Sequence, residues 1–367
     1  MAQIKTNFFA NLIYLLFFTI TFTGQIFITS DIIRNLLVVC CGFIAFLFTF
    51  IKKKKDCYIV IFFVFVFSLL EILSMLYNGN SSFLEIIWIF TYSGIGILIY
   101  NFKISYKISK IILCIPFLYF LICIILNKDP NLILHGGSRN IISVFLILYE
   151  SIYYFLRYKQ IKNIDILPAF LSLIFCIWAS GRAGIISSFF IFIVVLLTVL
   201  FQNKKNRLKK ILLVIFIFFI LVFILRNYLD FYNLTILERF KREGLKSSRS
   251  ILIEEYFLGI TSNFFDFLFG VPFVNYKFLN FYKNPHNSFL MLHSKYGLFG
   301  FLLVVYLLIK LFFSKLKKLY LFELFLGISI IFRALLDWVA FPGMFDILFW
   351  ISFLEVLNKK NNKKFKE

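Results

Sequence analysis

Long, unbroken apolar runs constrain the fold of this chain more than any other feature. A helix needs about 20 apolar residues to cross a bilayer, and twelve runs approach that length. Within each run the residues are apolar continuously rather than alternately, which favours helices over a membrane β-barrel. With 61% hydrophobic residues in a chain of 367, the sequence predicts one all-α polytopic membrane domain, residues 1–367, with about twelve transmembrane helices. The expected spans are 8–29, 34–51, 57–77, 83–100, 111–127, 140–156, 165–180, 184–201, 211–226, 296–313, 319–336 and 343–357.

Basic residues gather after every second apolar run. Lysines cluster at 52–55 after the second run and at 315–318 after the tenth, and the fourth, sixth, eighth and twelfth runs are followed in the same way. The short connections after odd-numbered runs, such as 78–82, are nearly neutral. Because cytoplasmic connections are enriched in Lys and Arg, we expect both termini in the cytoplasm. This clustering also accounts for the net charge of +21 and argues against nucleic acid as a partner.

One connection, residues 227–295, is long and lies on the outer side in this topology. Long loops in compact proteins are usually functional. This one is rich in Lys and Arg, against the topology rule, which indicates an anionic ligand. Within it, Ser247 and Ser248 precede the apolar residues of 251–260 and predict an amphipathic helix with a serine N-cap at the membrane surface. Asn263 is expected to cap a second, short helical segment that ends at Gly270.

Two of the three histidines lie where this loop returns to the membrane. His286 is a candidate general base, because histidine can accept a hydroxyl proton near neutral pH; the alternative is a helix cap or an interfacial hydrogen bond. His293 is a candidate substrate-binding residue, with a packed core histidine as the stronger alternative. Tyr282 belongs to an aromatic and basic segment, 275–283, whose rings could stack on sugars or sit at the bilayer interface.

Arginines are the candidates for binding an anion, because guanidinium binds phosphate with two parallel hydrogen bonds. Arg182 lies between two apolar runs, flanked by Gly181 and Gly184, and is either an anion clamp or a boundary anchor. Arg249 lies in the first turn of the expected loop helix, where backbone N–H groups also attract phosphate. Arg249 and the neighbouring Arg242 share one alternative, that of solvated loop charges.

The acidic residues and the six cysteines show no metal-ligand spacing, so neither a metal nor another cofactor is expected. Most acids in the apolar runs lie near span ends, which favours an anchoring role. Arg333 and Asp337 are four residues apart and are expected to pair on one helix face.

A short motif connects these features to a known family. His286-Asn287, nine further residues and then Gly297-x-x-Gly300 resemble the signature of the O-antigen ligase and Wzy-type polymerase superfamily. The arginine motif at 180–184 resembles a second family motif, and Arg249, an apolar helix and then the segment 269–272 resemble a third. Twelve spans with one large external loop before the tenth also match the family architecture. The resemblance covers about 175–360.

The resemblance implies a metal-independent, inverting glycosyltransferase in the bacterial cytoplasmic membrane, with its active site facing outward. Its donor would be a glycan on undecaprenyl diphosphate, and its acceptor a sugar hydroxyl. Carried onto this chain, the family places Arg182 and Arg249, with Arg242 nearby, on the diphosphate, and His286 and Asn287 on the acceptor. A chain-length regulator and a flippase are candidate protein partners.

The sequence is compatible with three functions. The leading one is a polymerase that joins lipid-linked repeat units, because Phe301 and Leu302 follow Gly300 where ligases often have small hydroxyl residues. The second is a ligase that transfers the finished glycan to a lipid A core. The third is a flippase, but transporters of this size usually show internal pseudosymmetry, and none is visible here.

Overall fold

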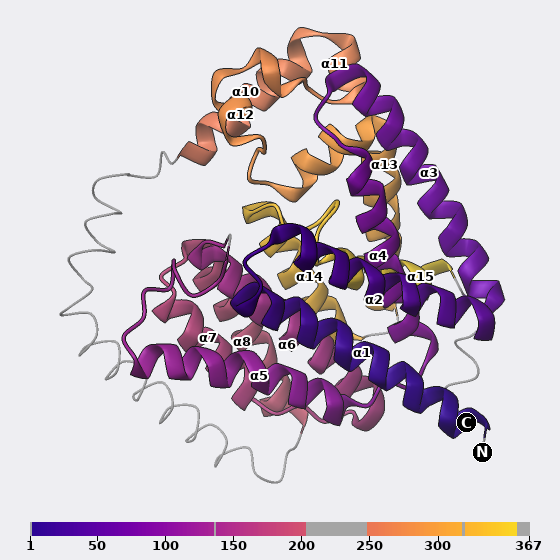
Figure 1. Cartoon of the computed structure of the whole chain (residues 1–367), viewed down its shortest axis with the longest axis vertical. Coiled ribbons are helices and arrows are strands. Elements are labelled where there is room, and N and C mark those ends of the chain that lie inside the picture. Colours follow the sequence, from indigo (N-terminus) through magenta and orange to yellow (C-terminus); the bar gives the residue numbers. More distant parts are fainter. Residues whose placement is uncertain (1, 136, 203–247, 318–319, 358–367) are drawn as a thin grey trace.

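The computed structural model describes residues 2–135, 137–202, 248–317 and 320–357. Within these ranges the regular elements are all helices. Figure 1 shows a bundle of long helices with a smaller group of short helices at one end, which we call the cap. The cap consists of α10 (Ser248–Ser262), α11 (Phe264–Phe269), the single 3₁₀ turn η2 (Phe273–Asn275) and α12 (Lys277–Tyr282).

Eight helices in the described part of the chain are long and apolar enough to cross a membrane. This confirms the expected class, an all-α polytopic membrane protein, while the total of twelve spans remains a prediction. The eight are α1 (Ala2–Phe27), α2 (Asp31–Lys52), α3 (Lys54–Asn78), α4 (Phe83–Asn101), α5 (Tyr106–Ile125), α6 (Arg139–Ile161), α8 (Arg182–Gln202) and α13 (Ser288–Lys317).

Three further expected spans form shorter helices, of 12, 16 and 12 residues. They are α7 (Leu167–Trp178), α14 (Leu321–Leu336) and α15 (Asp346–Leu357). The expected ninth span, 211–226, lies outside the described residues. α13 starts at Ser288, within the segment assigned to the outer loop, but Gly297 interrupts it with a non-helical φ of +62°. The expected start of the tenth span, at 296, coincides with this break.

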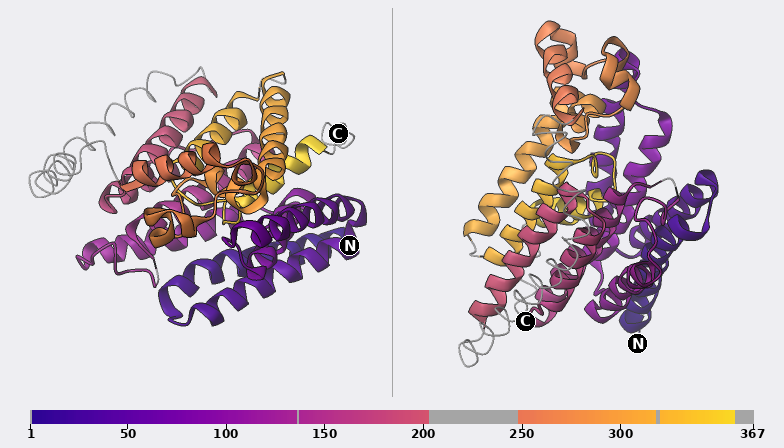
Figure 2. Two further views of the ribbon diagram at one scale, coloured as in Figure 1. Left: turned by 90° about the horizontal axis from the view of Figure 1, so that it is seen from above. Right: turned by 90° about the vertical axis from the view of Figure 1, so that its left-hand side faces the viewer.

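Glycines let the central helices cross closely, as is common in membrane bundles. A Cβ atom on Gly94 of α4 would lie 2.4 Å from the carbonyl oxygen of Gly42 in α2. Two residues later, on the opposite side of α4, a Cβ on Gly96 would lie 2.6 Å from Cβ of Trp350 in α15. α4 is therefore held between α2 and α15. In both views of Figure 2 the N-terminal helices, coloured indigo and purple, lie together along one side of the molecule.

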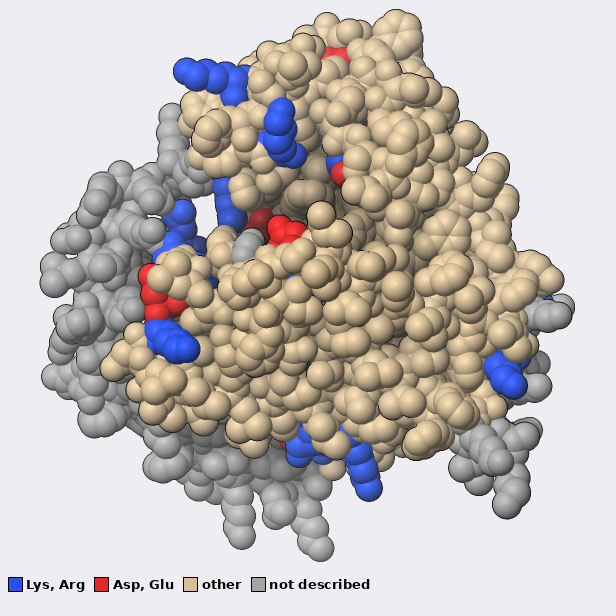
Figure 3. Space-filling view, in the orientation of Figure 1, with Lys and Arg blue, Asp and Glu red and all other residues tan. Residues whose placement is uncertain are grey.

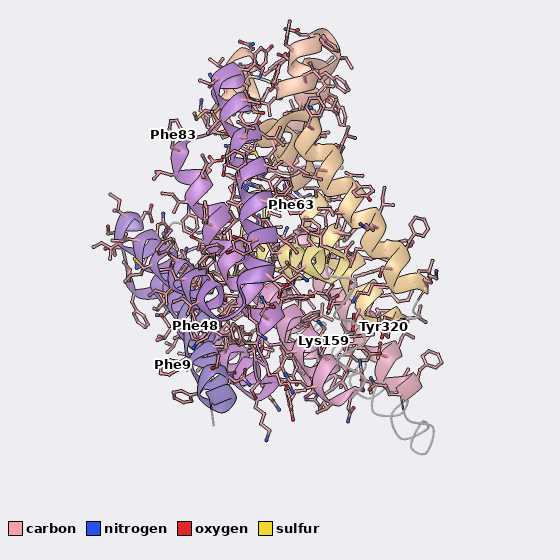
Figure 4. All side chains as sticks on the ribbon, turned by 90° about the vertical axis from the view of Figure 1, so that its right-hand side faces the viewer. Phe9, Phe48, Phe63, Phe83, Lys159 and Tyr320 are labelled. Atoms are coloured by element: carbon pink, nitrogen blue, oxygen red, sulfur yellow. The ribbon has the colours of Figure 1, made fainter. Side chains whose placement is uncertain are left out.

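The outer surface of the bundle is apolar, as a lipid-facing surface must be. Phe9 and Phe83 are 52% and 66% exposed, and Figure 4 shows side chains of this kind projecting from the outer helices. The same view places Phe83 toward the cap, whereas Lys159 and Tyr320 lie in the opposite half of the molecule. The cap therefore lies at the end away from the basic cluster that follows α6.

The cap and the start of α13 share a small hydrophobic core, separate from that of the bundle. Its members are Leu252, Tyr256, Val271, Phe273, Leu279 and Met291. A helix forms at each of the two expected places. α10 begins at Ser248, but its apolar residues are both buried and exposed, so it is not the amphipathic helix that was expected, and its serine cap and membrane position remain predictions. Asn263 caps α11, as expected, by accepting a hydrogen bond from the backbone N–H of Phe265 at 2.9 Å. Gly270 ends α11, as expected, with a φ of +89° that favours glycine.

Candidate active site

The His-Asn motif forms the turn that starts α13. Asn287 is the N-cap, because its Oδ1 atom accepts the backbone N–H groups of Phe289 at 2.9 Å and Leu290 at 3.1 Å. His286 precedes it with a φ of +50°, which is uncommon for a residue other than glycine. Its backbone N–H donates to Oδ1 of Asn284 at 2.8 Å, which holds this turn. Local polar side chains thus fix the position of the histidine.

The C-terminal end of α14 forms the other half of the site. Asn287 donates from Nδ2 to the carbonyl oxygen of Leu335 at 3.0 Å. Ser288 donates from Oγ to the carbonyl oxygen of Asp337 at 2.7 Å and accepts the backbone N–H of Val339 at 2.9 Å. The start of α13 is therefore fastened to the end of α14, where helix carbonyls would otherwise lack partners.

Asp337 is the centre of a charged cluster at this junction. Its Oδ1 atom lies 3.3 Å from Nδ1 of His286. Its Oδ2 atom lies 3.4 Å from Nη2 of Arg333 and 3.6 Å from Nη2 of Arg249. Arg249 also donates from Nη1 to the carbonyl oxygen of Leu336 at 2.6 Å. One carboxylate therefore brings together a histidine, an arginine of the cap and an arginine of α14.

The environment of Asp337 keeps it ionised. Burial alone would raise the pKa of its carboxyl group, but the hydrogen bond from His286 and the charges of Arg333 and Arg249 outweigh burial and hold that pKa below its ordinary value. An ionised Asp337 accepts a hydrogen bond, so it favours the tautomer of His286 with the proton on Nδ1. Within the described part of the chain no group hydrogen-bonds the other ring nitrogen, Nε2. That nitrogen is then able to accept a proton.

The exposure of these side chains separates those that can touch a substrate from those that support them. The side chains of His286 and Arg249 are 28% and 29% exposed, whereas that of Arg333 is 0% exposed. Figure 3 shows a hollow below the cap with basic and acidic side chains at its edge. A ligand at this site would meet His286 and Arg249, with Asp337 and Arg333 behind them.

The structure places Arg182 at the first residue of α8, with an exposed side chain. The start of α8 packs closely on α6, since a Cβ on Gly184 would lie 2.5 Å from Cβ of Ser143. Ser143 in turn accepts a hydrogen bond from Nη2 of Arg333 at 3.3 Å. The first turn of α8, which Arg182 begins, therefore packs beside Ser143, a hydrogen-bond partner of Arg333. Arg242 lies outside the described residues.

His293 lies in a different environment from His286. It is 5% exposed, and both ring nitrogens have partners: Nδ1 lies 2.8 Å from the hydroxyl of Tyr256, and Nε2 lies 2.8 Å from the carbonyl oxygen of Phe267. This geometry favours the packing alternative, in which His293 joins α13 to the cap. Tyr282 is 39% exposed, and its ring meets that of His286 edge to face with a centroid distance of 6.1 Å.

The sequence singled out Asp337 only as the partner of Arg333, and that pair is confirmed at 3.4 Å. Its contact with His286 spans 51 positions in the sequence, and no local pattern indicates it. The signal that could have pointed to a functional role of Asp337 is its place among the ionisable residues of an apolar region, which are functional candidates by default. Among the described residues, no group of three or more His, Cys, Asp or Glu side chains is arranged to hold a metal ion.

Comparison with known protein families gives a match to part of the chain. A family model described as O-antigen ligase matches residues 167–305, a range that contains Arg182, Arg249 and His286. No curated protein and no solved structure matches the chain significantly. This match supports a relationship between residues 167–305 of the chain and the O-antigen ligase and Wzy-type polymerase superfamily, which indicates an enzyme of glycosyl transfer.

Proposed function

We propose that the protein is a polymerase of surface polysaccharide, of the O-antigen or capsule type, which joins repeat units carried on undecaprenyl diphosphate at the outer face of a bacterial cytoplasmic membrane. One observation carries this proposal. His286, through Nδ1, and Arg249, through Nη2, contact the same carboxylate of Asp337 at the junction of the cap and the bundle. A base and a cation at one site are what transfer of a sugar from a diphosphate to a hydroxyl requires.

The first half of the reaction concerns the acceptor. A sugar hydroxyl placed at Nε2 of His286 would give its proton to that nitrogen while its oxygen attacks the anomeric carbon of the donor. The ionised Asp337 then faces the imidazolium that forms and stabilises it. General-base catalysis of this kind contributes about 10²- to 10⁴-fold. Asn287, which caps α13, holds the turn that carries His286.

The second half concerns the leaving group. As the new bond from oxygen to the anomeric carbon forms, the bond from that carbon to the diphosphate oxygen breaks, and the electron pair leaves with the lipid diphosphate. Arg249 supplies a cation for the charge that develops there, and Arg182 and Arg242 are the further candidates. A single displacement inverts the anomeric configuration. The cations are all side chains, so the reaction we propose needs no metal.

A ligase is the second candidate, because the matching family model is described as O-antigen ligase. Both enzymes would use the same donor and the same step at the anomeric carbon. They differ in the acceptor, which is a second lipid-linked repeat unit for the polymerase and a lipid A core for the ligase. The residues after Gly300, Phe301 and Leu302, favour the polymerase.

Deletion of the gene followed by gel analysis of surface polysaccharide tests the proposal. Loss of a polymerase leaves single repeat units on the core, whereas loss of a ligase leaves full-length chains on the carrier lipid. Complementation with wild type should restore polymer, and complementation with His286→Ala should not. His135→Ala is the matched control, since His135 is an exposed histidine of another connection. An unchanged polysaccharide pattern in the deletion strain would rule out both functions.

A further inference from the structure

A second group of ionisable side chains lies inside the bundle, away from the site described above. It consists of Glu71 in α3, Glu85 in the first turn of α4, and Lys295 in α13. Lys295 is 1% exposed, and its Nζ atom lies 2.8 Å from Oε1 of Glu85. Nζ also donates to the carbonyl oxygen of Asn80. A lysine that the sequence counts among the loop charges is therefore a buried ion-pair partner.

Glu71 completes the group without a visible hydrogen-bond donor. It is 1% exposed, and among the described residues neither of its carboxylate oxygens has a hydrogen-bond partner. The charges of Glu85 and Lys295 both act on the Glu71 carboxylate. Oε2 of Glu85 and the hydroxyl oxygens of Ser74 and Ser81 are also buried without partners. The two serine hydroxyl groups carry protons of their own, but in this structure neither donates to a carboxylate oxygen of the group. Because buried polar atoms almost always have partners, the three unpaired carboxylate oxygens require a donor.

Counting charge identifies that donor. Two carboxylates and one ammonium group leave a net charge of −1, and a buried charge that is not balanced is costly in a membrane protein. One added proton makes the group neutral and supplies an O–H donor between the two carboxyl groups. Tyr296 of α13 lies within electrostatic range of both glutamates and of Asp346 of α15. Asp346 is occupied separately, by the backbone N–H groups of Phe341 and Gly343, so it does not supply the missing donor.

We propose that Glu71 and Glu85 hold one proton between them beside Lys295, and that this buried proton-binding site keeps α3, α4 and α13 joined under the cap. The proton would lie on Glu71, since Glu85 is the carboxylate paired with Lys295.

The surrounding hydrogen bonds connect this proton site to the cap. Asn80, whose carbonyl oxygen accepts from Lys295, donates from Nδ2 to the carbonyl oxygen of Val271 and to Oγ of Ser294. Its Oδ1 atom accepts the backbone N–H of Phe273. Asn78 donates to the carbonyl oxygens of Phe269 and Ser294. The connection between α3 and α4 therefore binds both the cap and the first half of α13, which begins at the proposed active site.

Infrared spectroscopy of the full-length protein in lipid vesicles tests the proposal, because a protonated carboxyl group has a C=O stretching band that a carboxylate lacks. Charge balance sets the expected result for each variant. Wild type holds one proton at this site near neutral pH. Glu71→Gln and Glu85→Gln are each neutral without it, so each should lose one carboxyl band relative to wild type. Lys295→Met needs a second proton and should gain one.

Glu254→Gln is the control, because Glu254 is exposed on α10; its spectrum should match that of wild type in the carboxyl region. A wild-type spectrum that is unchanged in both glutamine variants would show that neither glutamate is protonated and would overturn the proposal. Loss of the wild-type band when sodium replaces choline at constant pH would overturn it in favour of a sodium site. If Lys295→Met does not fold, the two glutamine variants still decide the question.

Discussion

Asp337 contacts His286 through one carboxylate oxygen and two arginines through the other. The Nδ1 atom of His286 lies 3.3 Å from Oδ1, while Arg333 and Arg249 approach Oδ2 at 3.4 and 3.6 Å. These three partners come from the start of α13, from α14 and from the cap. The carboxylate therefore has two roles, since it orients the proposed base and it holds the cap arginine at the end of α14.

Replacement of Asp337 by Asn tests the first role. The amide keeps the shape but can donate a hydrogen to Nδ1, which would favour the wrong tautomer and leave no free acceptor at Nε2. We expect the rate of glycosyl transfer from a lipid-linked donor to fall at least about tenfold, with little change in the amount of protein in the membrane. Asp129→Asn, at an exposed outer turn, should leave the rate unchanged. A normal rate in Asp337→Asn would remove Asp337 from the mechanism.

The second role makes a prediction about pH and stability. The folded pKa of Asp337 is below its ordinary value, so its charge stabilises the protein above the unfolded pKa of about 3.9. That contribution should be lost only as the pH falls through the lower, folded pKa. We therefore expect the difference in unfolding temperature between wild type and Asp337→Asn to be constant from about pH 5 to pH 8 and to shrink at more acidic pH. A difference that grows on acidification would contradict this sign.

Arg249 uses two separate nitrogens of its guanidinium group. Nη1 donates to the carbonyl oxygen of Leu336, and Nη2 faces Asp337. Lysine is a single point charge and cannot repeat this arrangement while binding a phosphate. We expect Arg249→Lys to lower kcat/KM for the lipid-linked donor by about tenfold or more, which corresponds to about 1.4 kcal/mol.

The matched control for Arg249 is Lys277→Arg, a change at an exposed basic residue of the same cap. It should leave kcat/KM unaltered. If Arg249→Lys turned over donor at the wild-type rate, Arg249 would be a solvated charge rather than a ligand of the diphosphate.

The absence of a metal requirement is a separate prediction. The proposed reaction balances the charge of the leaving diphosphate with arginines alone. Incubation of the purified protein with EDTA should therefore leave its turnover unchanged. Inhibition that magnesium or another divalent ion reverses would show that a metal takes part.

Local patterns predicted the local structure well. Asn263 and Gly270 mark the start and end of α11, because capping depends on residues a few positions apart. The pair formed by Arg333 and Asp337 followed from their spacing of four residues on one helix. The sequence placed His286 where the loop returns to the membrane but expected the next helix only from residue 296, whereas α13 begins at Ser288.

Contacts between distant segments were not predictable from these patterns. His286 meets Asp337 only because α13 docks on the end of α14, and one sequence does not reveal which helices are neighbours. Lys295 was assigned to the basic loop because of its neighbours in the sequence, yet it pairs with Glu85, 210 positions away. Helix packing decides which charges are buried, so burial and pairing became visible only in the structure.

The pair between Lys295 and Glu85 leads to the last prediction. Removal of one partner of a buried pair leaves the other charge without compensation and typically costs about 3–5 kcal/mol. Lys295→Met should therefore lower the unfolding temperature of the protein, and the loss should grow as the pH rises, because the variant must hold two protons on Glu71 and Glu85. The double variant Lys295→Met with Glu85→Gln removes the stranded charge and should regain much of that stability.

Thermal unfolding is measured for wild type, Lys295→Met, Glu85→Gln and the double variant, in one detergent and across a pH series. The four unfolding temperatures give the coupling between positions 295 and 85. If the losses in unfolding temperature of the two single variants are strongly non-additive in the double variant, Lys295 and Glu85 form a buried pair whose charges balance each other. If the two substitutions instead lowered the unfolding temperature additively, Lys295 and Glu85 would stabilise the bundle independently. The cap would then be held by the asparagine contacts of the connection between α3 and α4 alone.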